Sequence, residues 1–103
     1  MRPRAEEPHV AIADLGAWGA AWLAAEYDPE ADAIRIDARA VALIATALGR
    51  AEAERFVACA TAHERFHRAY PEATEAEARA HAAASSGADA ERYERILRAA
   101  ARR

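Results

Sequence analysis

The segment TAHERFH, residues 61–67, holds the side chains of this chain that are best suited to chemistry. His63 and His67 are four residues apart, so on a helix both imidazoles project from one face. Two imidazole nitrogens at this spacing can bind one zinc ion, each at about 2.0–2.1 Å. Glu64 follows the first histidine, where a carboxylate can stand beside the ion and act as a general base on an activated water. This HExxH pattern predicts a hydrolytic zinc site.

The helix expected to carry the motif, residues 51–70, directs both histidines toward its apolar face, which also includes Phe56, Cys59 and Tyr70. Two inward imidazoles would otherwise need separate hydrogen-bond partners, whereas one metal ion satisfies both. The alternative is an ordinary pair of histidines, because alanine-rich helices with many glutamates produce such pairs by chance. Cys59 is interpreted as a small buried hydrophobe. Core packing is favoured over a catalytic role for Tyr70.

A catalytic zinc site needs a third protein ligand, and the next helix, EATEAEARAHAAA, offers carboxylates. Glu77 shares a face with several alanines that can pack closely against the motif helix. Glu75 falls near the opposite side and is expected to face solvent. We therefore predict Glu77 as the third ligand. His81 can orient Glu77, replace it as a ligand, or be partly exposed.

Three segments together resemble a known family. EYDPEADAIRID, ATAHERFH and EARAHA look like the hairpin, the zinc motif and the third-ligand helix of the ImmA/IrrE-type metallopeptidases, a gluzincin-like group. The resemblance covers residues of about 22–85. It implies zinc bound by His63, His67 and Glu77, with Glu64 as general base and with protein substrates that are often regulators.

The elements around the motif indicate an α+β fold. In the segment before residue 37, Asp28, Pro29 and Glu30 form a turn between two short runs, and Ile34 and Ile36 alternate with polar residues, which predicts a β-hairpin. Residues 32–37 are the expected edge strand, which can hold an extended peptide by main-chain hydrogen bonds. An edge simply covered by the N-terminal arm is an equally good interpretation.

Helix signals then follow at short intervals. Asp37 caps a helix that Gly49 ends, Pro71 ends the motif helix, SSG closes the third, and Asp89 caps a fourth. Residues 1–9 are expected to be a flexible arm. Residues 10–21 are ambiguous, because their apolar spacing suits a helix whereas two glycines weaken it. We predict one small zincin-like domain over residues 1–103, with a hairpin or small sheet packed on about four helices.

Composition narrows the function classes. The net charge of −3 gives no strong general attraction to nucleic acid, and no segment is expected to cross a membrane. One cysteine and no signal-like segment favour the cytoplasm. The leading hypothesis is a small zinc metallopeptidase acting on a protein or peptide substrate. Because large core residues are few, the alternative is a non-catalytic, zinc-stabilised interaction or regulatory module. The oligomeric state is left open.

Overall fold

The computed structural model describes residues 7–15 and 24–101, and the predicted α+β class is confirmed. Trp18 of the ambiguous segment lies outside the described residues, as do Trp22, just after that segment, and most of the predicted arm. The elements, in chain order, are β1 (His9–Ala13), β2 (Ala25–Asp28), β3 (Ala33–Asp37), α1 (Ala38–Leu48), α2 (Arg50–Ala69), α3 (Glu75–Ser86) and α4 (Ala90–Ala101).

The sheet contains the predicted hairpin and one strand more. β2 and β3 pair antiparallel, with Tyr27 opposite Ile34, and β1 pairs parallel with the other side of β3, with Val10 opposite Ile34. The strand order β1-β3-β2 makes β3 the central strand, so the expectation that residues 32–37 form the edge is wrong. Residues 9–13 form a strand, where the sequence suggested the end of an arm and an ambiguous segment. Val10 and Ile12 alternate with smaller or polar residues, which was the available signal.

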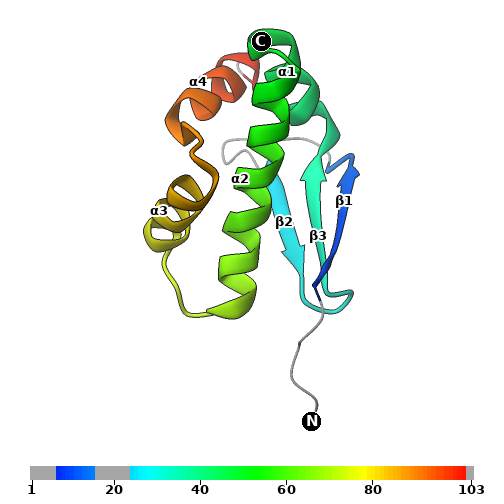
Figure 1. Cartoon of the computed structure of the whole chain (residues 1–103). Coiled ribbons are helices and arrows are strands. Elements are labelled where there is room, and N and C mark those ends of the chain that lie inside the picture. The colour runs from blue at the N-terminus through cyan, green and yellow to red at the C-terminus, as the bar shows by residue number, and fades with distance from the viewer. Residues whose placement is uncertain (1–6, 16–23, 102–103) are drawn as a thin grey trace.

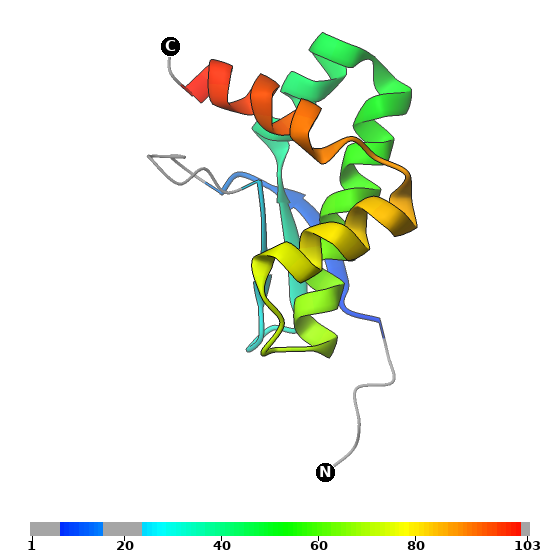
Figure 2. The same ribbon diagram turned by 90° about the vertical axis from the view of Figure 1, so that its left-hand side faces the viewer.

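Helix α2 lies between the sheet and α3, as Figure 1 shows. Seen from the side in Figure 2, α3 crosses α2 and α4 lies nearer the α1 end of the molecule. Helix α4 contacts both α1 and α2. The motif helix is therefore flanked by strands on one side and by α3 on the other, and both neighbours can contribute to a site on it.

The core is small, as the composition predicted. Its fully buried large apolar side chains are Ile34, Ile36, Ile44 and Leu97. The rings of Phe56 and Tyr93 meet edge to face, with centroids 5.3 Å apart. Helix α3 contributes only Ala78 and Ala82 as buried residues, so it packs closely on its neighbours with little apolar area.

The helices begin where short polar side chains cap them. The Asp37 carboxylate accepts a hydrogen bond from the Ala40 backbone N–H and starts α1, as predicted. Thr74 caps α3 and forms a capping box with Glu77, so this helix begins three residues later than the predicted Glu72. Among the described helices, none combines the length and the apolar content that a membrane-crossing segment requires.

Candidate metal centre

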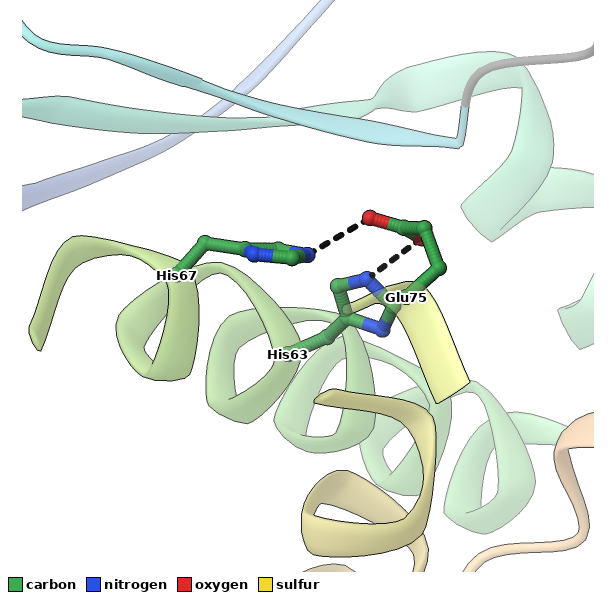
Figure 3. A group of neighbouring side chains, drawn as sticks. All are labelled: His63, His67 and Glu75. Carbon is green, nitrogen blue, oxygen red and sulfur yellow. Dashed lines mark hydrogen bonds and ion pairs between the residues drawn. The ribbon is translucent and has the colours of Figure 1, made fainter. Parts of the chain in front are cut away.

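Two histidines of α2 meet a carboxylate at the first residue of α3. Nε2 of His67 lies 2.6 Å from Oε1 of Glu75, and Nε2 of His63 lies 3.1 Å from Oε2 of the same carboxylate. Figure 3 shows the two rings converging on Glu75 from one face of α2. The i, i+4 spacing read from the sequence thus brings both imidazoles together, with ring centroids 5.0 Å apart.

The histidines are partly buried, whereas the carboxylate is open to solvent. The side chains of His63 and His67 are 19% and 22% exposed, and that of Glu75 is 73% exposed. Burial lowers the pKa of His63, and this effect outweighs the opposite effect of the Glu75 carboxylate. His63 is consequently neutral at neutral pH. A neutral imidazole is the form that binds metal ions, since its nitrogen lone pair is available.

Glu77 does not lie where the sequence placed it. Its carboxylate accepts a hydrogen bond from the Thr74 backbone N–H at 2.8 Å, on the exposed side of α3. Ala78 and Ala82 face the protein, and Glu75 is on the same side as Ala78, three residues before it. The expected facing of this helix is therefore wrong by about a third of a turn. Because α3 has alanines all around, small residues alone did not distinguish its two faces.

Two further residues singled out from the sequence lie away from the cluster. His81 is exposed and its ring stacks on that of Phe66, with centroids 4.7 Å apart. Of the three roles considered for His81, exposure is the one observed. Tyr70 is 59% exposed, so the expected core packing is wrong for it. Cys59 is buried, as predicted.

Glu64 is placed beside the cluster but does not join it. Its side chain lines a cavity of about 300 Å³ together with His63 and Glu75. Burial raises the pKa of Glu64, partly offset by the attraction of His67. A carboxylate with a raised pKa is a stronger base than one with the ordinary value.

The donor set fits a divalent metal ion. The ligand atoms of His63, His67 and Glu75 all lie within 4.8 Å of one another. Two ligand atoms around one tetrahedral zinc ion are about 3.3 Å apart, a separation that falls within this limit. The same three groups also form a hydrogen-bonded cluster without a metal.

Strand β2 runs past the cluster on its other side. In Figure 3 this strand, in cyan, passes over His67 and Glu75. Ala24 and Ala25, at its start, line the same cavity as Glu64. Among the described residues, β2 has a strand partner only on its β3 side. The sheet edge closest to the cluster is therefore β2, and not the segment 32–37 predicted from the sequence.

Comparisons with known proteins identify no relative. No protein-family model, no curated protein and no solved structure matches this chain.

Proposed function

We propose that this protein is a small zinc-dependent metallopeptidase. The single observation that supports it best is the convergence of His63, His67 and Glu75 beside a desolvated Glu64. In this proposal Glu75 takes the ligand role that the sequence and the family resemblance suggested for Glu77. The buried Cys59 agrees with a reducing compartment, and we propose a cytoplasmic location.

Each residue of the cluster has a separate role in the proposed reaction. His63, His67 and Glu75 hold the ion, which when bound supplies an acidified water and a polarised substrate carbonyl. Glu64 takes the proton of the attacking water and returns it to the leaving amine. The edge of β2 aligns an extended substrate by main-chain hydrogen bonds, since β2 passes the cluster and, among the described residues, pairs with a strand only on its β3 side. The substrate class is accordingly an extended segment of a protein or peptide.

Replacement of Glu64 by glutamine tests the catalytic role. Glu64→Gln keeps the size of the side chain and both histidines, so zinc content should remain close to that of the parent. Peptide cleavage should fall by about 10²–10⁴-fold, the usual contribution of a general base. The assay compares parent and variant on a peptide library, at matched zinc occupancy, with and without chelator. Glu54→Gln, at an exposed position of the same helix, is the control with the same charge change.

The outcomes of this cleavage assay distinguish the peptidase from its alternatives. Cleavage that is lost with chelator and in Glu64→Gln, but kept in Glu54→Gln, supports the peptidase. Cleavage that survives Glu64→Gln contradicts the assigned base and indicates a contaminating protease.

A zinc-stabilised binding module is the second candidate. Helix α3 buries only two alanines, and Glu75 at its first residue is joined to α2 through the histidines. An ion at this point would fasten α3 to α2, which adds stability that the small core does not provide. Zinc binding without any cleavage by the parent protein would favour this function.

A further inference from the structure

The cavity that contains Glu64 is also lined by a second charged group. Its lining includes His63, Cys59 and Phe56 of α2, Glu75 and Arg79 of α3, and Glu94 and Arg98 of α4. Alanines and the Tyr93 ring line it as well. Burial is the main cause of the lowered pKa of His63, and Arg79 is close enough to His63 to contribute to it. The proposed metal centre and the arginines therefore border one hollow.

The group of Arg79, Glu94 and Arg98 carries more positive than negative charge. Nη2 of Arg79 lies 2.6 Å from Oε2 of Glu94, and Nη2 of Arg98 lies 3.6 Å from Oε1 of the same carboxylate. One carboxylate thus faces two guanidinium groups, which leaves a net charge of about +1 there when arginine is always protonated. The distance of Arg98 is beyond that of a hydrogen bond, so this guanidinium is only loosely held by Glu94.

Within this group the carboxylate is more buried than the guanidinium groups. The Glu94 side chain is only 16% exposed, whereas those of Arg79 and Arg98 are 43% and 58% exposed. Glu94 thus contacts both cations from a more buried position, and both arginines also line the cavity. Guanidinium groups have five N–H donors in a planar fork that matches a carboxylate. Glu64 and Glu75 also line the cavity, so its carboxylates outnumber its guanidinium groups, and the positive charge that can attract an anion is confined to the two arginines.

The spacing of the lining residues relates this group to the proposed chemistry. Glu75 and Arg79 both line the cavity and are four residues apart on α3, which corresponds to about 6 Å at 1.5 Å per residue. An extended peptide covers that distance with about two residues. A substrate whose carbonyl lies at the metal centre can therefore bring to the arginines a carboxylate carried within about two residues of the cleaved bond.

We propose that Arg79 and Arg98, positioned by Glu94, form a carboxylate-binding subsite for the substrate. The carboxylate comes either from an acidic side chain or from the C-terminus of the substrate, since both present the same group. The role of the subsite in cleavage rests on the proposed peptidase function, whereas binding of a carboxylate does not depend on it.

The binding test uses small probes and chelator-treated protein, so that no metal ion can bind the probe. The probes are N-acetyl-glutamate N-methylamide, its uncharged glutamine analogue, and N-acetyl-alanine, which carries only an α-carboxylate. NMR titration follows the Nε–Hε resonances of the arginine side chains. A carboxylate probe should shift those of Arg79 and Arg98 saturably, and the glutamine analogue should not. The tighter of the two carboxylate probes identifies the source of the carboxylate.

Substitutions predict the direction in which carboxylate affinity should change. Arg98→Gln should weaken carboxylate binding by about tenfold or more, because it removes a charged hydrogen-bond donor. Arg95→Gln, at an exposed position of α4 outside the cavity, removes the same charge and should leave binding unchanged. Equal shifts with the glutamine analogue, or equal losses in Arg98→Gln and Arg95→Gln, would overturn the subsite.

Cleavage assays separate this inference from the proposed function. Peptides that differ only by glutamate or glutamine within about two residues of the cleaved bond, each with free and amidated C-termini, are compared by kcat/KM. The acidic or free-carboxylate form should be preferred, and Arg98→Gln should remove the preference while Arg95→Gln keeps it. Cleavage without any preference for a carboxylate overturns the subsite and leaves the peptidase standing. Carboxylate binding at the arginines without any cleavage supports the subsite and contradicts the peptidase.

Discussion

At the residue scale, the cluster depends on which glutamate of α3 reaches α2. Glu75 is the first residue of the helix, and its side chain reaches the histidines from above the last turns of α2. Glu77, two residues on, points to the other side and completes the capping box. The two glutamates therefore have separate roles, one at the candidate centre and one in starting the helix.

These roles predict different effects of two similar substitutions. Glu75→Ala should weaken zinc binding by about tenfold or more, because the site loses its anionic ligand. Glu77→Ala should leave zinc affinity unchanged and lower only the melting temperature, because it removes half of a capping box. Calorimetric titration of both variants with zinc measures the difference. A larger loss of affinity in Glu77→Ala would contradict the geometry of the cluster.

Tyr93 provides a residue-scale prediction that is independent of any metal. Its hydroxyl donates a hydrogen bond to Glu52 at 2.9 Å. Burial and then this hydrogen bond raise the pKa of Tyr93 to about 12. Below pH 10 the phenol is neutral in both folded and unfolded chains, so its contribution to stability is complete. Above pH 10 the unfolded chain loses the proton first, and the contribution is lost as pH approaches 12.

Tyr93→Phe should therefore lower the free energy of unfolding by about 1 kcal/mol at pH 7, the usual worth of a hydrogen bond. It should also reduce the loss of stability between pH 10 and 12. Urea unfolding of parent and variant across this range tests both effects. Tyr70→Phe, at a tyrosine that is 59% exposed, is the control and should change neither quantity. An unchanged alkaline slope in Tyr93→Phe would contradict the assignment.

At the scale of elements, the start of α1 is the most tightly held junction between strand and helix. Asp37 ends β3, is only 1% exposed, and accepts hydrogen bonds from the backbone N–H groups of Ala40 and Leu15. It thereby joins β3, α1 and the segment after β1. Asp89, which caps α4 through the Arg92 N–H, is exposed.

Asp37→Ala should lower the free energy of unfolding by about 2 kcal/mol or more. The substitution removes a helix cap and leaves backbone N–H groups at this junction without an acceptor. Asp89→Ala should lower the free energy of unfolding by about 1 kcal/mol, since water can replace an exposed cap. Chemical unfolding of both variants gives the comparison. Equal costs would show that the burial of Asp37 adds nothing to its function as a cap.

At the scale of the whole molecule, zinc binding and folding should be linked. An ion held only by the folded chain stabilises it according to the ratio of free zinc to its dissociation constant, by about 4 kcal/mol at a thousandfold excess. For a domain of this size, each kcal/mol raises the melting temperature by about 4–8 °C. The melting temperature should therefore rise with zinc concentration in the parent protein.

Substitution of the histidines separates a specific site from general metal binding. His63→Ala and His67→Ala should abolish the zinc-dependent rise. His81→Ala should keep it, because His81 is exposed and stacks on Phe66 away from the cluster. Thermal scans with and without zinc measure the rise. A parent protein whose melting is unaffected by zinc would contradict both proposed functions.

Local signals in the sequence determined much of this protein. The hairpin, the four helices and the meeting of His63 with His67 follow from turn formers, caps and the i, i+4 spacing, all of which act within a few residues. These features were predictable because the interactions that stabilise them are made with the backbone or with side chains a few residues away. The α+β class follows directly from the order of such elements.

Only the tertiary structure decided which faces and edges meet. Helix α3 carries alanines on both sides, so the choice of Ala78 and Ala82 as its buried face, and hence of Glu75 over Glu77, depends on contacts with α2. Likewise, β3 became central because β1 pairs with it across more than twenty residues of sequence. The Arg79–Glu94–Arg98 group also joins two helices. Such pairings depend on packing between distant segments, about which the local pattern carries no information.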